Sequence, residues 1–390
     1  MVEWKKIWEV TIWDKRFNGV ENHMQPQVIK YHYYLANELS ELERNNGNLR
    51  ILYTTDRVAF ADDSEVDKNV SEGEVVTIPG GGNVSIKYYK GKFITADNRI
   101  ATSNDTNLLS NKFLYYWMVS QKDLIGSFYR GAGIKHPSML SVLNMDIPVP
   151  SLSEQSRIVS ILDTFTASID NLKQQIEQRR KQYEYYRDQL LDLEGKEGVE
   201  MKTLGEVCII KNGYTPSTKN PDFWDNGKLP WFTLEDIRKN GRILKDAIKH
   251  ITPLGVKKGG LFPKDSIIVS TTATIGEYAL IKTDFLCNQQ ITCLSIKESC
   301  KDQLLSKYLY YLSDGIGKWC KKNVNGGGSL LIVSTSKIHN LAVPIPSLAE
   351  QSRIVGILDT FEASIANLEN QLKLREKQYE FYRNKLLSFE

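Results

Sequence analysis

Cationic and amide side chains gather in segments of this chain that are predicted to be loops. Lysine and arginine can bind guanine edges or phosphates, and asparagine and glutamine can bind adenine edges, provided that the side chains are held rigidly. Glycine-rich turns can offer backbone N–H groups to phosphate. Taken singly, each residue fits a solvated surface better. The candidates are Gly81, Asn83, Lys92, Arg99, Arg130 and Lys135 in the first region, and Arg238, Asn240, Arg242, Asn288, Gln289, Gln290, Lys321, Lys322 and Asn325 in the second.

Residues that could perform catalysis do not form a recognisable constellation. The sequence has no Walker A motif, no H-E-x-x-H and no G-x-S-x-G, and its five histidines lack metal-ligand spacing. Asn220-Pro221-Asp222-Phe223 is similar to the Asn-Pro-Pro-Phe/Tyr signature of adenine methyltransferases, but its third residue is Asp and no glycine-rich cofactor loop precedes it. We therefore predict no catalytic site, no metal and no cofactor in this chain.

Composition limits the class of protein. A chain of 390 residues with 41% hydrophobic and 25% charged residues should form two globular domains. There is no apolar run of membrane-spanning length and no secretion signal, and the five cysteines lack C-x-x-C spacing, so we expect a cytoplasmic protein with reduced thiols. The net charge is only +3, yet residues 201–330 carry 19 Lys and Arg against 12 Asp and Glu. This excess suits a surface that faces phosphates.

One stretch of the sequence occurs twice. Residues 147–193 and 343–389, aligned at an offset of 196, agree at 30 of 47 positions. Shorter matches at nearly the same offset lie in the regions before each copy, for example between Lys112–Tyr116 and Lys307–Tyr311. A repeat this long indicates a duplicated domain rather than a solenoid. The predicted domains are 1–146 and 199–342, and the predicted helical arms are 147–198 and 343–390.

Both copies have the heptad pattern of a helix that pairs along its length. A Pro-x-Pro sequence precedes each helix, and Ser151 with Glu154 has the spacing of a capping box. Helices of about 40 residues would be roughly 60 Å long. The predicted seam contains Ile158, Leu162, Phe165, Ile169, Leu172, Ile176, Arg179 and Tyr183 in the first copy, and Ile354, Leu358, Phe361, Ile365, Leu368, Leu372, Arg375 and Tyr379 in the second.

Connectivity favours antiparallel pairing of these helices within one chain, which would bury both seams and place the globular regions at opposite ends of a rod. Pairing with a second chain is the alternative. The arginine that interrupts both seams suggests a fixed register or a carboxylate on a partner. For both globular regions we predict a mixed α/β fold with a small twisted sheet. The expected helices are 27–46, 108–120 and 306–312. The expected strands are 50–53, 74–78, 84–89, 92–95, 231–237, 266–270, 276–281 and 289–296.

The duplicated P-x-P-S-L-x-E-Q-x-R-I-V-x-I-L-D sequences, each leading into a heptad helix, resemble the specificity subunit of type I restriction-modification systems. In the second region, Leu204–Val207, Pro230–Ile237, Thr272–Gly276 and Asn288–Gln290 add to this resemblance, and Thr272 joins the candidate DNA-binding residues through it. The first region departs from the usual pattern, because Trp8 replaces a glycine. Its Gly80–Asn83 and Asp97–Ile100 stand where the Thr-Ile-Gly and Asn-Gln-Gln segments are expected.

The resemblance implies a non-catalytic DNA-recognition subunit. Each variable region would be a target recognition domain for one half of a bipartite, asymmetric site in double-stranded DNA. The helices would set the spacing and bind two modification subunits, which hold S-adenosylmethionine, while restriction subunits use ATP and Mg²⁺. Two other classes stay open at this point: an interaction scaffold with duplicated coiled-coil arms that binds no DNA, and a stand-alone adenine methyltransferase.

Overall fold

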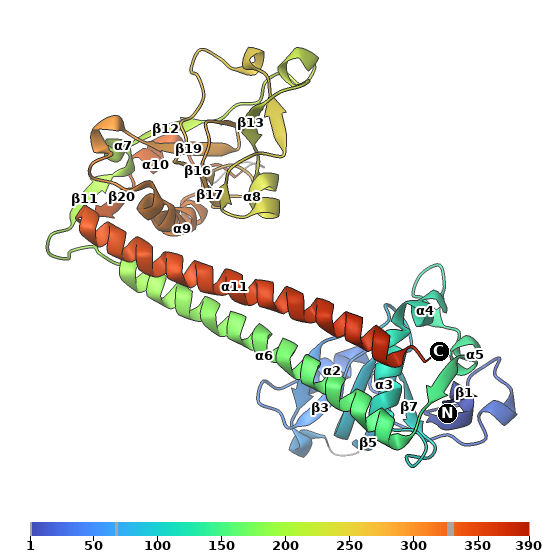
Figure 1. The fold of residues 1–390 in the computed structure, drawn as a ribbon. Helices are drawn as coiled ribbons and strands as arrows, with labels where there is room; N and C mark the ends of the chain where they lie inside the picture. The colour runs from blue at the N-terminus through green and yellow to red at the C-terminus, as the bar shows by residue number, and fades with distance from the viewer. Residues whose placement is uncertain (1, 67–68, 326–330, 390) are drawn as a thin grey trace. The chain divides into compact units, whose positions relative to one another are not determined.

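The structure, a computed structural model, describes residues 2–66, 69–325 and 331–389, so that Gly326–Ser329, one of the predicted glycine-rich turns, lies outside the described residues. The chain divides into two compact units. The first comprises Met1–Gln174 with Glu369–Glu390, and the second comprises Gln175–Leu368. Each unit therefore contains one globular region and one half of each long helix (Figure 1).

The globular region of the first unit combines a six-stranded sheet with short helices. Its strands are β1 (Glu3–Lys6), β2 (Thr11–Trp13), β3 (Leu49–Leu52), β4 (Val58–Ala61), β5 (Ser71–Pro79), β6 (Lys87–Thr95), β7 (Asn98–Ser103), β8 (Tyr129–Arg130), β9 (His136–Pro137) and β10 (Asp146–Val149). Its helices are α1 (Ile7–Val10), α2 (Ala36–Leu42), α3 (Asn111–Ser120), α4 (Lys122–Ser127) and α5 (Met139–Leu143), with 3₁₀ turns at Asn22–Met24 and Asp63–Glu65.

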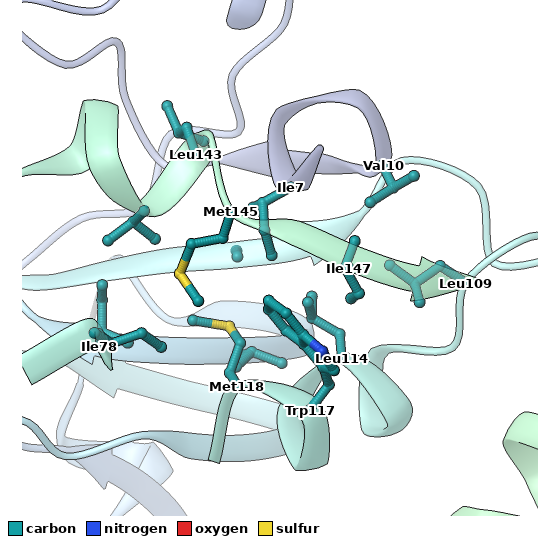
Figure 2. Packing of buried hydrophobic residues seen from close by; sticks show 14 of the residues in the cluster. Ile7, Val10, Ile78, Leu109, Leu114, Trp117, Met118, Leu143, Met145 and Ile147 are labelled. Carbon is teal, nitrogen blue, oxygen red and sulfur yellow. The ribbon is translucent and has the colours of Figure 1, made fainter. Parts of the chain in front are cut away.

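The six-stranded sheet has the order β2-β7-β5-β6-β3-β4 and curls back on itself. Two strands separate β7 from β3, yet the Asn98 Nδ2 at the start of β7 donates to the Leu52 carbonyl at the end of β3 at 2.8 Å. One cluster of buried residues unites α1, α3, α5 and β10, and Figure 2 shows Trp117 and Met118 of α3 packed among Ile7, Met145 and Ile147. Ile158 and Leu162 of the first long helix belong to the same cluster.

The second unit has a five-stranded sheet, a three-stranded sheet and a strand pair. Its strands are β11 (Glu200–Thr203), β12 (Cys208–Asn212), β13 (Leu229–Phe232), β14 (Ile243–Leu244), β15 (Lys249–Ile251), β16 (Ser266–Ser270), β17 (Tyr278–Ile281), β18 (Leu286–Cys287), β19 (Ile291–Ile296) and β20 (Ala342–Ile345). Its helices are α7 (Leu204–Val207), α8 (Leu234–Asn240), α9 (Ser306–Lys322) and α10 (Thr335–His339), with 3₁₀ turns at Pro221–Phe223, Pro253–Gly255 and Glu298–Cys300.

The continuous apolar run in β16 is explained by its central position. Ile267 and Val269 face the cluster that contains Tyr308 of α9, whereas Ile268 faces a second cluster with Phe232 and Phe285. Alternate residues of a strand point to opposite faces, so a strand that is covered on both faces needs apolar residues throughout.

The two globular regions share one topology. The order β12-β19-β16-β17-β14 repeats β2-β7-β5-β6-β3, and in both sheets the last of these strands runs parallel to its neighbour. In each region the first strand also pairs antiparallel with the last one before a long helix, with Trp4 opposite Pro148 and Met201 opposite Pro344. The predicted duplication of one mixed α/β fold is thus confirmed, with β4 an addition in the first region.

The long helices are α6 (Leu152–Leu191) and α11 (Leu348–Leu387), of 40 residues each (Figure 1). At their N-termini Ser151 Oγ and Ser347 Oγ accept from the backbone N–H groups of Glu154 and Glu350. A full capping box would also have the Glu154 carboxylate accept from the backbone N–H of Ser151. The Glu154 carboxylate instead accepts from the Arg157 guanidinium at 2.6 Å. In both units α6 and α11 pack antiparallel within one chain, so the prediction of intramolecular pairing is confirmed.

Several predicted element boundaries were wrong. Residues 27–46 form a helix only at Ala36–Leu42, and residues 84–86 lie outside β6. The strand predicted over 231–237 ends at Phe232, because Thr233 starts α8 with a capping box in which its backbone N–H and hydroxyl donate to Asp236. The helix expected at 306–312 continues to Lys322.

Candidate nucleic-acid interface

Three segments of the second unit are joined by backbone hydrogen bonds. They are the turn between β16 and β17 (Thr271–Gly276), the turn before β19 (Asn288–Gln290) and the chain around the described residues 323–325 and 331–333. Thr271 N–H donates to the Gln290 carbonyl at 2.9 Å, and Val333 N–H donates to the Thr271 carbonyl at 2.9 Å. Ala273 N–H donates to the Leu331 carbonyl at 3.1 Å. We refer to these segments together as the loop surface of the second unit.

The first unit builds the same arrangement from different residues. Its loop surface comprises the turn after β5 (Gly80–Asn83), the turn before β7 (Ala96–Asp97) and the β8–β9 hairpin (Tyr129–Pro137). Gly80 N–H donates to the Asp97 carbonyl at 2.8 Å, as Thr271 does to Gln290. Gly82 N–H donates to the Lys135 carbonyl at 2.9 Å, as Ala273 does to Leu331. Corresponding turns of the two sheets therefore carry the loop surfaces, in agreement with the positions assigned from the sequence.

Glycine is needed where these turns approach other backbone. A Cβ on Gly80 would lie 2.5 Å from the Asp97 carbonyl oxygen. A Cβ on Gly276, which has φ of +90°, would lie 2.5 Å from the Gly317 carbonyl oxygen of α9 and 2.9 Å from Lys321 Cε. The second turn is therefore packed directly on α9, beside a cationic side chain.

The Asn288-Gln289-Gln290 segment divides into a structural and an accessible part. Asn288 Oδ1 accepts from the Gln290 N–H at 3.1 Å, and Asn288 Nδ2 donates to Gln290 Oε1 at 3.3 Å, so these two residues hold the turn. Gln289 is exposed, and its Oε1 accepts from the Thr215 hydroxyl at 2.5 Å. Gln289 is consequently the member of the three that is best placed to meet a ligand.

The two predicted arginines of the second region already have partners in the protein. Arg238 forms a salt bridge with Glu277 at 2.7 Å, and Arg242 donates to the Tyr278 hydroxyl at 2.7 Å while lying over its ring at 4.4 Å. Both partners begin or precede β17, next to the loop surface. The remaining candidates of this region comprise half-buried Thr272 and exposed Asn240, Lys321, Lys322 and Asn325.

In the first region the structure places Asp97, rather than Arg99, at the surface. The Asp97 side chain is 48% exposed and that of Arg99 only 15%, and the two form a salt bridge at 2.5 Å. Lys15 approaches the same carboxylate at 3.4 Å. Burial opposes ionisation of Asp97, but its hydrogen bonds to, and the charges of, Arg99 and Lys15 outweigh burial and lower its pKa.

The other candidates of the first region separate into two groups. Asn83, Arg130 and Lys135 are exposed on the loop surface, and half-buried Gly81 lies between them. A Cβ on Gly81 would be 2.9 Å from Ile134, so the turn contacts the hairpin. Lys92 instead lies on β6, where it forms an ion pair with Asp63 at 3.3 Å.

A lysine at the start of β6 is held inside the protein. Lys87 Nζ donates to the Tyr53 carbonyl at 2.7 Å. Burial lowers the pKa of Lys87 to about 8, opposed by the nearby Asp56 carboxylate and reinforced by Arg50. Lys87 is therefore a poor candidate for a phosphate contact.

Each long helix is joined to its globular region by a buried glutamine. Gln155 is fully buried, and its Oε1 accepts from Ser110 N–H at 2.9 Å while its Nε2 donates to the Leu108 and Pro150 carbonyls. Gln351 makes the three equivalent bonds with Leu305 N–H and the Gln303 and Pro346 carbonyls. Both polar atoms of each glutamine amide are thus bonded, through three hydrogen bonds that are the same at the two junctions.

A carboxylate about two turns further along each helix makes a second matched contact. Asp163 accepts from the Tyr116 hydroxyl at 2.6 Å and from Lys112 Nζ at 2.7 Å. Asp359 accepts from the Tyr311 hydroxyl at 2.5 Å and pairs with Lys307 at 3.0 Å. These contacts explain why the Lys-x-x-x-Tyr spacing occurs in both regions.

The predicted helix seam serves two purposes. Its first positions, Ile158 and Leu162 with Ile354 and Leu358, are fully buried in the cores of the globular regions. These cores also include the end of the other helix, through Leu387 in the first unit and Leu190 in the second. Further along, Phe165 stacks on Tyr382 and Phe361 stacks on Tyr186, with ring centroids 5.4 and 5.5 Å apart. Ile169 and Ile176 are buried, whereas the positions that are half-buried comprise Leu172, Tyr183, Ile365, Leu368, Leu372 and Tyr379.

Two other features are absent from the described residues. No group of three or more His, Cys, Asp or Glu side chains in this part of the chain could hold a metal ion. None of the helices found there combines the length and apolar character required to cross a membrane.

Comparison with known proteins assigns the chain to a family. The family described as "Type I restriction modification DNA specificity domain" matches twice, at residues 28–179 and 196–375. The chain therefore belongs to this family, as a specificity subunit rather than an enzyme in its own right.

Individual relatives agree with this assignment. The chain is 36% identical over 314 residues to the EcoR124I/EcoR124II specificity subunit of Escherichia coli, covering 75% of this chain and 74% of that one. It is 44% identical over 215 residues to the EcoprrI specificity subunit of the same species, a match that spans 52% of this chain and about half (53%) of that relative.

Solved structures support the fold. The crystal structure of a type I restriction-modification system S subunit from M. genitalium aligns with a TM-score of 0.61 at 17% identity, covering 100% of this chain and 97% of that one. A chain from a structural study of complex assembly and conformational transition in the type I system gives the same TM-score at 16% identity, covering 99% and 97%. These neighbours have the two-domain architecture with long paired helices described above.

Proposed function

We propose that this chain directs a type I restriction-modification complex to its target by reading a bipartite, asymmetric site in double-stranded DNA. The loop surface of each globular region reads one half-site. The unread base pairs between the half-sites are set by α6 and α11, which also dock two modification subunits. We further propose that the chain acts in the cytoplasm, where DNA is accessible.

One observation carries this proposal. The two units share strand order, helix junctions and the backbone bonds that hold the loop surfaces, yet the side chains on those surfaces differ: Gly80–Asn83 and Asp97 in one, Thr271–Gly276 and Gln289 in the other. A reader of two unlike half-sites needs such a constant scaffold with different contact residues, because base identity is read by side chains that are held in place.

The chemistry is expected to lie in partner subunits. We propose that the modification subunits bind S-adenosylmethionine and methylate adenine, and that restriction subunits use ATP and Mg²⁺. The Asn220–Phe223 sequence supports this division, because it forms a 3₁₀ turn in which Asn220 Oδ1 accepts from the Asp222 N–H at 3.1 Å. The asparagine is thereby used to hold a turn.

Methylome mapping tests the proposal directly. Genomic DNA from the host strain and from a strain lacking this gene is sequenced for methyladenine. A bipartite motif that disappears with the gene, and returns when the gene is supplied again, is the expected result. An unchanged methylome in a strain that expresses active modification subunits would contradict it.

Binding measurements separate the remaining classes. An interaction scaffold would bind other proteins but no duplex at any salt concentration, whereas a DNA reader loses affinity steeply as salt rises. Binding of S-adenosylmethionine to the isolated chain in calorimetry would indicate a stand-alone methyltransferase. We expect no heat of binding from the isolated chain.

A further inference from the structure

The long helices expose aromatic side chains at matched positions. Phe381 and Tyr382 of α11 are 61% and 42% exposed, and Tyr185 and Tyr186 of α6 are 59% and 44% exposed. The two pairs are related by the same offset of 196 that relates the two copies of the repeat. Single exposed apolar residues are common on protein surfaces, whereas a patch of them marks a binding site, so the contacts among these rings decide their meaning.

In the first unit the rings form one continuous patch. Phe381 lies edge-on to Tyr382 with ring centroids 5.3 Å apart, and Tyr382 stacks on Phe165 of α6 at 5.4 Å. We call Phe165, Phe381 and Tyr382 the aromatic surface of the first unit. The patch crosses from one long helix to the other, so its shape depends on the pairing of the helices.

The second unit builds the same patch from the other copy of each residue. Tyr185 lies edge-on to Tyr186 at 5.4 Å, and Tyr186 stacks on Phe361 of α11 at 5.5 Å. We call Phe361, Tyr185 and Tyr186 the aromatic surface of the second unit. Each of its residues has its counterpart 196 positions away in the first aromatic surface, and the order of the contacts is the same. The two surfaces are therefore equivalent residue by residue.

Two equivalent surfaces fit two copies of one partner. The loop surfaces of the two units carry different side chains, as the reading of unlike half-sites requires, whereas the aromatic surfaces present the same contacts twice. Aromatic side chains are enriched at protein–protein interfaces, where a few of them provide most of the binding free energy. One kind of molecule that binds each unit in the same way accounts for the repetition.

The charge of the long helices favours a protein as this partner. The helices α6 and α11 each carry six Lys and Arg residues and six Asp and Glu residues. A nucleic acid strand that stacks on aromatic rings also needs a positively charged groove that follows its phosphates, which these neutral helices do not supply.

A second copy of this chain fits the aromatic surfaces less well. A chain that bound its own kind through two equivalent surfaces would join two neighbours and extend into filaments unless the contacts closed on themselves. A separate partner that uses one site per molecule instead gives a closed assembly of defined size.

We propose that each aromatic surface is the binding site for one modification subunit, and that Tyr185 and Phe381, the most exposed members of the two surfaces, are the anchors. This inference rests on the proposed function, which assigns two modification subunits to α6 and α11, and it adds the residues that bind them. The modification subunit should present an apolar pocket that accepts Phe381 of one unit and Tyr185 of the other.

Single substitutions should weaken the two sites one at a time. The full chain is titrated with the purified modification subunit of the same system, with native mass spectrometry for stoichiometry and calorimetry for affinity. The unmodified chain should bind two modification subunits. F381A and Y185A should each leave one strong site and one that is about 30-fold weaker, the usual effect of truncating an aromatic anchor. The double variant should have two weak sites.

A matched control is available on the same helix. Leu374 of α11 is 53% exposed and belongs to the same unit as Phe381, but the first copy of the repeat has Gln178 at the corresponding position. L374A should therefore leave both sites unchanged. Circular dichroism and thermal unfolding of all variants establish that they are folded.

Three results would overturn the inference while leaving the proposed function intact: F381A and Y185A proteins that bind two modification subunits as tightly as the unmodified chain, an L374A protein that is weakened to the same extent, or a loss of duplex affinity in F381A and Y185A when no modification subunit is present. Self-association of the unmodified chain that disappears in F381A would also overturn it, because the surface would then bind a second copy. Failure of the unmodified chain to bind any modification subunit would instead contradict the proposed function itself.

Discussion

The guanidinium of Arg375 lies 5.8 Å from the ring centroid of Phe165, and Arg179 lies 5.9 Å from that of Phe361. Each arginine thus covers the aromatic residue of the opposite helix, once in each unit, and the two contacts are related by the 196-residue repeat. Of the two roles considered for the seam arginines, a register contact between the helices matches these positions. A cation placed over a ring stabilises one alignment of the helices and not one that is shifted by a turn.

Weakening this contact should lower the free energy of unfolding slightly, and the effects of substituting the arginine and the phenylalanine should be coupled. We expect R375M and F165L each to destabilise the first unit, and a double-mutant cycle in urea to give a coupling energy of about 0.5–1 kcal/mol, the usual value for such a contact near the surface. The exposed Lys377 provides the control, because K377M should show no coupling to F165L. Zero coupling between Arg375 and Phe165 would argue against a role in register.

Substitution of the buried glutamines should lower the free energy of unfolding much more. Gln155→Leu removes three hydrogen bonds and leaves the Ser110 N–H and two carbonyls unpaired beneath the helix, which we expect to reduce the free energy of unfolding by about 3 kcal/mol or more. Gln351→Leu should have a similar effect in the second unit because its contacts are the same. Differential scanning calorimetry of both variants measures this, and the exposed Gln189 serves as the control through Q189L. A loss below 1 kcal/mol would mean that water replaces the missing bonds.

Lys87 should impose a pH dependence on stability. Its folded pKa of about 8 lies below the ordinary 10.5, so between these values the unfolded chain binds a proton that the folded chain has released. The contribution of Lys87 to stability is therefore complete above about pH 10.5 and is lost as the pH falls towards 8. Urea unfolding across this range should show a smaller rise with pH in K87M than in the unmodified protein. K90M, which changes an exposed lysine, should keep the original slope.

Substitutions of Gln289 and Asn288 should have different effects, the first on base specificity and the second on the stability of the fold. Q289A removes an exposed amide, so we expect relaxed base preference at one position of one half-site, worth about 1–3 kcal/mol of discrimination, with unfolding unchanged. N288A removes the acceptor that holds the Gln290 N–H, so it should lower both stability and affinity for every sequence. Selection of binding sites from a randomised library, together with melting curves, measures both effects. A uniform loss of affinity in Q289A would mean that this residue contacts only the DNA backbone.

The spacing between half-sites should follow helix length. Removal of one heptad from the middle of both α6 and α11 shortens each helix by about 10 Å. Because stacked base pairs are about 3.4 Å apart along each strand, the preferred spacer should shrink by about three base pairs while the half-sites remain unchanged. Methylome mapping of a strain that carries the shortened protein measures this. Removal from α6 alone should disrupt pairing and abolish methylation, and an altered half-site sequence would contradict the spacer role.

Sequence patterns predicted the elements whose residues repeat or alternate. The heptads located both long helices, although the predicted arms, 147–198 and 343–390, extend beyond α6 (Leu152–Leu191) and α11 (Leu348–Leu387) at both ends. The 196-residue offset indicated the common fold of the two globular regions before the strand order was visible. Local sequence patterns predicted secondary structure less well where tertiary contacts and capping determine the conformation. Thr233 and Asp236 turn an apolar run into a helix by capping it, and nothing in the hydrophobic pattern of 231–237 distinguishes that outcome from a strand.

The loop surfaces were the least predictable part. Residue type singled out Arg99 and Arg238, but their carboxylate partners Asp97 and Glu277 occupy them, and only the folded chain shows these pairs. Trp8 departs from the family pattern, and its ring packs edge-on against His23, whereas Gly205 at the matching place leaves the room that His339 fills.

The seam contacts join the first copy of the repeat to the second through identical residue types. Arginine meets phenylalanine and tyrosine meets phenylalanine in both units, so the same surfaces would equally suit two separate molecules that each carried a single copy. Such a homodimer would present two equal reading surfaces and could recognise only a palindrome. The covalent link through residues 192–199 makes the two unlike copies pair with each other. Under the proposed function, the directionality of the target would therefore originate in a short connecting peptide rather than in the helices themselves.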